Sequence, residues 1–228
     1  MTGTIVNAIA IIAGSLAGLV FRKGIPDRYN TTIMQSIGLA VVLVGLRSAF
    51  RSEDLLLIIV CLALGSLLGE WMGIEARLKA MGHWFETRFA DSGTGFAKGF
   101  VTATLVYCVG SMAIVGAMES GLTGDHQTLF AKAVLDGITA VVFTATMGLG
   151  VMLSAVSVFI YQGLITGGAL MLKPLLVPEV VNQMSAVGGL LIVGLGINLL
   201  ELSRLNVGNM LPAIFLPLVY YIIRSFGG

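Results

Sequence analysis

Long apolar segments, separated by short polar stretches, dominate the pattern of this chain. A helix needs about 20 mostly apolar residues to cross a hydrocarbon core of ~30 Å. Eight segments approach this length: Thr4–Phe21, Thr32–Ala49, Leu55–Met72, Gly99–Met118, Leu129–Met147, Val151–Met171, Val181–Leu200 and Asn209–Ile223. Only Gly148-Leu149-Gly150 separates the fifth segment from the sixth, so these two form either a hairpin or one long kinked element. The pattern predicts an all-α integral membrane protein, a polytopic bundle of seven or eight transmembrane helices, with eight preferred.

One stretch, Ile74–Asp91, has a different pattern. Its apolar residues recur at helical spacing, and charged residues lie between them. Such an amphipathic helix is typical of the headgroup region of a membrane, and Trp84 would anchor it there. We expect it to lie on the membrane surface and to lead through a flexible joint into the fourth span.

Composition supports the membrane assignment. The chain is 57% hydrophobic and 11% charged, whereas about a quarter of the residues of a soluble domain are charged. The formal net charge of +1 gives no field that would attract nucleic acid, so no nucleic-acid partner is expected. No basic residue precedes the first apolar segment, so this segment is read as a retained span and not as a secretory signal.

Glycines lie mostly inside the apolar segments. In lipid, small residues spaced four apart allow two helix backbones to approach closely. Three such pairs occur, within Gly14–Gly18, Gly65–Gly69 and Gly163–Gly167. We expect each pair to lie at a tight helix–helix contact.

The two ends of the chain show an internal similarity. A shift of 149 residues places Gly14 on Gly163, Ser36 on Ser185 and Val44-Gly45-Leu46 on Val193-Gly194-Leu195 without a gap. With eight spans, spans one to three would match spans six to eight in inverted orientation, which is typical of transporters. With seven spans the two copies would be parallel, and a shared packing pattern without functional meaning is the alternative.

This repeat suggests a division of the single transmembrane domain, residues 1–228. A first three-helix repeat (1–73) is followed by the amphipathic helix and joint (74–97). A central helix pair (98–148) and a second three-helix repeat (149–228) complete the chain.

Orientation is predicted from the Lys and Arg residues near the ends of the spans. With eight spans, one side carries Arg22, Lys23, Arg28, Arg77, Lys79, Arg88, Lys98 and Arg204. The other side carries Arg47, Arg51, Lys132, Lys173 and Arg224. The richer side is placed in the cytoplasm, and the N-terminus is then outside.

Asp136 is the ionisable residue that lies deepest in a predicted span. Ionisable groups in a bilayer are costly and usually have a function or a partner. At a similar depth, the fourth span contributes Tyr107, Cys108 and the Gly110-Ser111 pair, which would loosen that helix and free backbone carbonyls. The sixth span contributes Gln162. We interpret Asp136, Ser111, Tyr107, Gln162, Gly110 and Cys108 as a binding site for an ion or substrate.

A structural explanation of these residues is open as well. Lys132 lies four residues before Asp136 on the same helix face, so the two could simply pair. Alternatively, Lys132 could extend its ammonium to the membrane surface. Cys61 and Cys108 are most simply read as small buried hydrophobic residues.

No catalytic signature is present in the sequence. There is no His-Glu-x-x-His zinc motif, nucleophile elbow or phosphate-binding glycine loop. We therefore expect no enzymatic activity, no cofactor and no metal.

Three stretches resemble a bacterial membrane protein family of unknown function, the YqgA/YdfK-like proteins. They are Gly65–Glu70, Cys108–Ile114 with Gly116 and Gly121, and Asn206–Pro212. The resemblance extends over essentially the whole chain and implies a bacterial inner-membrane protein of this length. It implies no activity and no catalytic residues.

The function favoured by these observations is a small transporter or channel for an ion or a small polar solute across the inner membrane. A homo-oligomer, most simply a dimer, would help eight short helices to enclose a path. The main alternative is a scaffold or accessory subunit that binds other membrane proteins through its glycine faces. A membrane-embedded lipid enzyme is a weaker third possibility, because no nucleophile and base lie together.

Overall fold

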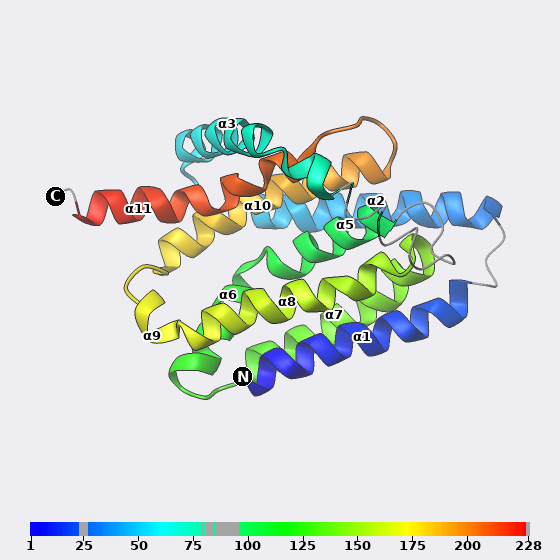
Figure 1. The fold of residues 1–228 in the computed structure, drawn as a ribbon, viewed down its shortest axis with the longest axis horizontal. Coiled ribbons are helices and arrows are strands. Elements are labelled where there is room, and N and C mark those ends of the chain that lie inside the picture. The colour runs from blue at the N-terminus through cyan, green and yellow to red at the C-terminus, as the bar shows by residue number, and fades with distance from the viewer. Residues whose placement is uncertain (23–26, 79, 81–83, 85–95, 227–228) are drawn as a thin grey trace.

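A computed structural model describes residues 1–22, 27–78, 80, 84 and 96–226 as a bundle of helices, with no strand among them (Figure 1). The long helices of the first half are α1 (Thr2–Arg22), α2 (Asp27–Ala49), α3 (Leu55–Met72), α5 (Phe96–Cys108) and α6 (Ser111–Leu122). The second half contains α7 (Gln127–Met147), α8 (Gly150–Gly167), the short α9 (Ala169–Leu172), α10 (Pro178–Leu199), the 3-10 helix η1 (Val207–Phe215) and α11 (Leu216–Phe226).

The predicted polytopic helical bundle is confirmed. Seven helical segments of the described chain are long and apolar enough to cross a membrane, and the bent pair α5–α6 would make an eighth span. Each of the eight predicted segments overlaps one of these. α1 begins and α11 ends toward the same side of the bundle, as an even number of spans requires (Figure 1).

Two glycines with positive φ mark the points where the chain departs from regular spans. Gly110, with a φ of 149°, separates α5 from α6, and the two helices meet at an angle of 57°. The predicted interruption of the fourth span at Gly110-Ser111 therefore exists. Gly148, with a φ of 82°, precedes α8, which turns back beside α7 (Figure 1). The fifth and sixth segments are therefore a hairpin and not one kinked element.

The amphipathic helix predicted over Ile74–Asp91 lies largely outside the described residues. Residues 74–78, 80 and 84 are helical. The remainder of that prediction, and the joint that follows it, falls on residues that the structure does not describe.

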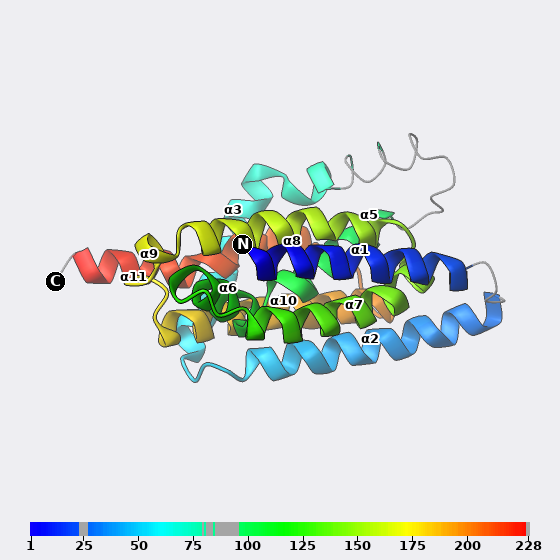
Figure 2. The same cartoon turned by 90° about the horizontal axis from the view of Figure 1, so that it is seen from below.

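The bundle has a buried centre and an apolar outer surface. α10 is the most enclosed span, with 78% of its apolar window buried. By contrast, α2 follows one outer edge of the bundle (Figure 2). On α3, Leu56 and Trp71 are 74% and 86% exposed, although both are large and apolar. Lipid is the environment in which such an outer surface is stable.

Close glycine packing is confirmed for two of the three predicted pairs. A Cβ on Gly14 would lie 2.1 Å from the carbonyl oxygen of Gly137 in α7. A Cβ on Gly69 would lie 1.8 Å from the carbonyl oxygen of Asn209 in η1. The prediction is wrong for the third pair, because Gly167 has no atom within 4 Å of its Cβ position. That pair lies on the outward face of α8, where the described part of the chain supplies no partner helix.

Three helices of the first half pack against three helices of the second half, each in antiparallel fashion. In α1 and α8, Thr4 faces Thr166 while Asn7 faces Gln162. α2 and α10 approach closely through their glycines, and α3 lies against η1. These pairs bring together segments that are far apart in the chain (Figure 1).

Candidate functional site

The central feature of the site is an ion pair within α7. Asp136 lies nine residues after the start of this 21-residue helix, which is ~14 Å along its axis and therefore near its middle. The ammonium nitrogen of Lys132 lies 2.6 Å from Asp136 Oδ2. Both residues are only 6% exposed. The spacing of four residues places both side chains on one helix face, so the helix itself brings the charges together.

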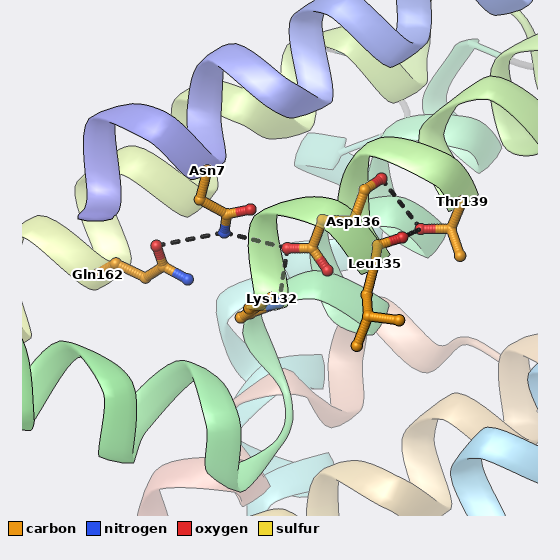
Figure 3. Close-up of polar contacts among 6 residues, drawn as sticks. All are labelled: Asn7, Lys132, Leu135, Asp136, Thr139 and Gln162. Carbon is orange, nitrogen blue, oxygen red and sulfur yellow. Dashed lines mark hydrogen bonds and ion pairs between the residues drawn. The ribbon is translucent and has the colours of Figure 1, made fainter. Parts of the chain in front are cut away.

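Two amide side chains extend this pair to neighbouring helices. The amide nitrogen of Asn7, in α1, donates to Asp136 Oδ2 at 3.1 Å and to Gln162 Oε1, in α8, at 3.3 Å (Figure 3). Asn7 and Gln162 are both 0% exposed. One buried network therefore links α1, α7 and α8. Beside it, the hydroxyls of Thr4 and Thr166 lie 3.5 Å apart and continue the polar contact between α1 and α8.

Tyr107, at the end of α5, closes another side of the network. Its ring stacks on Phe143, with centroids 6.2 Å apart, and the Lys132 ammonium lies 5.9 Å from its ring centroid. The ammonium is therefore within the range of a cation–π contact with this ring. The Tyr107 hydroxyl is buried beside Thr139 without a hydrogen bond of normal geometry.

The structure thus brings most of the predicted site residues together. Asp136 and Gln162 share the amide of Asn7, and Tyr107 contacts Lys132. Cys108 lies within electrostatic reach of the pair, and Gly110 forms the helix break just beyond it. The backbone of Ser111 begins α6, whereas its side chain lies outside the described part of the structure.

Sequence reasoning missed one member of the site and left the position of another open. Asn7 was not considered, although a lone amide inside an otherwise apolar first span is a readable signal. Of the two outcomes left open for Lys132, a position at the membrane surface is wrong, because its ammonium is held by Asp136 inside the bundle. The alternative, in which Lys132 simply pairs with Asp136, describes the observed contact.

A second polar cluster lies where α3 meets η1. The amide nitrogen of Asn209 donates to Glu70, and its oxygen accepts from the backbone N–H of Glu75 at 2.7 Å. The Glu75 carboxylate in turn accepts from the Gly208 backbone N–H at 2.8 Å. These bonds join the end of α3 to η1. A cavity of about 690 Å³ adjoins them, and its lining includes Glu75, Lys98 and Arg204 but no residue of the Asp136 network.

Metal ligands are not clustered in the described part of the chain. No group of three His, Cys, Asp or Glu side chains comes close enough there to hold an ion. The polar chemistry of the site is therefore that of an ion pair, two amides and a phenol.

These features define a polytopic α-helical membrane protein with a buried charged pair in mid-span. The chain belongs to the family described as "Protein of unknown function (DUF554)", whose model matches residues 2–222. It is similar to the "Uncharacterized membrane protein YdfK" of Bacillus subtilis (strain 168), with 36% identity over 100% of this chain and 99% of that protein. It is also similar to the "Uncharacterized protein YqgA" of Escherichia coli (strain K12), with 29% identity over 95% of this chain and 94% of that protein. No solved structure matches the chain. The resemblance found in the sequence is thus confirmed.

Proposed function

We propose that this protein is a small transporter or channel that moves an ion or a small polar solute across the membrane. The observation that carries the proposal is the Lys132–Asp136 pair, 2.6 Å long and buried in the middle of a span. Each charged residue at the centre of a spanning helix costs about 2.5–3.5 kcal/mol on insertion scales. Two such residues joined to polar groups from two further helices are typical of a transport pathway.

The geometry suggests how the site would work. Asn7 donates to both Asp136 and Gln162, so it connects the helices that surround the pair. A solute that competes for Asp136 or Lys132 would release Asn7 from the carboxylate and loosen α1 from α7. The break at Gly110 gives α5 and α6 a place to change their angle beside the same site. Binding would in this way be coupled to a rearrangement of the surrounding helices.

The helix arrangement supports an inverted repeat. The 149-residue shift pairs α1 with α8, α2 with α10, and α3 with the last span. The members of each pair pack against each other in antiparallel fashion. A two-fold axis in the membrane plane produces this arrangement, and transporters built in this way bind near the contact between the repeats.

Flux measurements with purified protein in liposomes test the proposal. We expect Asp136→Asn to abolish coupled transport, and the double variant Lys132→Met/Asp136→Asn to be folded and equally inactive. Asp125→Asn is the matched control, because it removes the same charge from an exposed loop. Normal flux in the double variant would exclude the pair from the pathway.

A scaffold or accessory subunit is the second candidate, and one observation favours it. Gly163 and Gly167 leave an open stripe on α8, flanked by Leu164, which is 70% exposed. In lipid, such a stripe favours contact with another helix. This role predicts stable co-purified membrane proteins and no flux in liposomes.

The same stripe supports a homodimer. Gly167→Leu would then convert the protein to a monomer in detergent, as measured by light scattering. Gly73→Leu is not a suitable control, because that glycine has a positive φ of 61°. Val156→Leu, on the exposed side of the same helix, is the better one.

Membrane side and compartment complete the proposal. Eight Lys and Arg residues lie on one predicted side and five on the other, and one of the five, Lys132, is paired inside the bundle. This bias supports an N-terminus outside the cytoplasm, in the inner membrane of a bacterium. We expect no enzymatic activity. Labelling of a single cysteine introduced at Thr2, in a variant without Cys61 and Cys108, tests the orientation. Modification of this cysteine by an impermeant maleimide on intact cells would support an N-terminus outside the cytoplasm. Absence of modification on intact cells would indicate the opposite orientation.

A further inference from the structure

We propose that the site takes up a small anion together with one proton, with Lys132 holding the anion and Asp136 holding the proton. This inference rests on the proposed transport function and names its substrate class. It follows from three features of the network: the fixed orientation of its amides, its unpaired donors and its charge balance.

The carboxylate fixes the orientation of both amides. An ionised Asp136 only accepts hydrogen bonds, so Asn7 must present its amino group to it. The same Asn7 nitrogen reaches Gln162 at 3.3 Å, so Gln162 must present its carbonyl oxygen. The Gln162 amide nitrogen is left without a partner, although the residue is 0% exposed. A buried unpaired donor of this kind is costly unless an acceptor fills the place.

Other donors are available on the same side of the network. An ammonium group has three donors, and the described hydrogen bonds of Lys132 use one, to Asp136. The Gln162 amide nitrogen is turned toward the side on which Lys132 lies (Figure 3). The Tyr107 hydroxyl is also buried, and the ring that carries it has its centroid 5.9 Å from the same ammonium. The only unpaired amide acceptor among the described members of the network is Asn7 Oδ1. The unpaired Gln162 amide nitrogen and the remaining donors of Lys132 therefore lie on one side of the network, and this side favours a ligand that accepts hydrogen bonds.

The charge balance connects anion binding to a proton. With Asp136 ionised, the pair is neutral, and Asp136 repels an incoming anion. When the carboxylate takes up one proton, it becomes a neutral acid and the Lys132 charge is no longer compensated. A bound anion then compensates the charge of Lys132. One proton and one monovalent anion are carried together, so the transported load has no net charge. A metal cation at the Asp136 carboxylate would be repelled by the Lys132 ammonium, so cation binding is disfavoured.

Among the residues that the structure describes, few other ionisable groups act on Asp136. Lys132 is on its own helix, and Tyr107 and Cys108 of α5 interact with it electrostatically. On α8 the only ionisable side chain is Tyr161, which interacts with Cys108, and on α1 it is Arg22 at the far end. α6 contributes Glu119, whose carboxylate accepts from Thr128. α2 carries Arg47, which is exposed, together with Asp27, Arg28 and Tyr29 near its N-terminus. Lys132 is therefore the charged group whose electrostatic environment changes most when Asp136 takes up a proton.

The test uses the full chain in liposomes that contain the pH dye pyranine. Potassium is equal on both sides and valinomycin is present, so the membrane potential is zero. Inward gradients of chloride, nitrate or lactate are imposed against gluconate, with empty liposomes as background. We expect at least one of these anions to acidify the interior ten-fold faster than the background. Lys132→Met and Asp136→Asn should reduce this rate to background, and Asp125→Asn should leave it unchanged.

Two further variants separate the anion site from a structural role. Lys132→Arg keeps the positive charge and should retain anion-driven acidification. Gln162→Leu removes the unpaired donor and should raise the KM for the anion about ten-fold or more, with a smaller effect on kcat. A Lys132→Met protein that still transports the anion with a proton would overturn the proposal.

Cation gradients distinguish the failure of this inference from the failure of transport itself. Sodium or potassium gradients that move protons through the native protein, but not through Asp136→Asn, would overturn the anion proposal and leave the transport function standing. If no gradient moves protons or anions, both proposals fall.

Discussion

Breaking the Lys132–Asp136 pair from one side should destabilise the protein far more than removing both charges. At 2.6 Å and an effective dielectric constant of about 20, the attraction is about 6 kcal/mol. Loss of hydration offsets much of it, so the net value of the pair is small. Removal of one partner leaves the other charge buried, which costs about 3–5 kcal/mol. We expect this loss for Lys132→Met and for Asp136→Asn, and a change within about 1 kcal/mol for the double variant.

Equilibrium unfolding measures these differences. The native protein and the three variants are titrated with sodium dodecyl sulfate in dodecyl maltoside micelles, and helicity is followed by circular dichroism. The double variant should be more stable than either single variant. If its loss instead equals the sum of the single losses, the two side chains do not form a pair in the folded protein, and the site described above is wrong.

Four further substitutions test the packing by the same unfolding measurement. Gly69→Ala should lower the free energy of unfolding by about 1–3 kcal/mol, because the new Cβ would lie 1.8 Å from the Asn209 carbonyl oxygen. Gly167→Ala is the control and should leave the stability nearly unchanged, because no atom lies within 4 Å of its Cβ position. Equal effects of the two substitutions would refute the close contact of α3 with η1. Thr144→Val should be neutral or stabilise by about 1 kcal/mol, because this buried hydroxyl has no hydrogen-bond partner among the described residues; a clear loss would reveal a partner that the structure does not contain. Asn209→Leu should cost about 1.5–3 kcal/mol through the lost bond to the Glu70 carboxylate, and an unchanged stability would show that this bond does not hold η1 to α3.

The spans and the depth of Asp136 were predictable, since both depend on local sequence. Segment length and apolar content fix which helices can cross hydrocarbon. The position of Asp136 within its segment gave its depth directly, and Gly110 marked the break in the fourth span. These properties follow from a few neighbouring residues and do not require knowledge of which helices touch.

Pairing between helices was not predictable in the same way. Lys132 could reach the surface or pair with Asp136, and only packing decides between these outcomes. Asn7 joins the site because α1 packs on α7 and α8, a contact that spans more than a hundred residues of chain. Likewise, Gly14 and Gly163 show the same four-residue spacing to a second glycine, yet only the first pair meets a helix of this chain. Spacing indicates a face that can pack, but it does not name the partner.

The proposed inverted repeat would account for the arrangement of helices around the site but not for the chemistry of the site. Under the 149-residue shift, Asn7 corresponds to Val156 and Gln162 corresponds to Ala13. Both of these positions are apolar and exposed, so the Asn7–Gln162 contact has no polar counterpart under the shift. Asp136 and Lys132 come from the central helix pair, outside the three-helix repeats. A symmetric arrangement of helices would thus hold an asymmetric site that is closer to the N-terminal end of α1. A rearrangement that exchanges the conformations of the two repeats would move the helices around this site, which is the basis of alternating access.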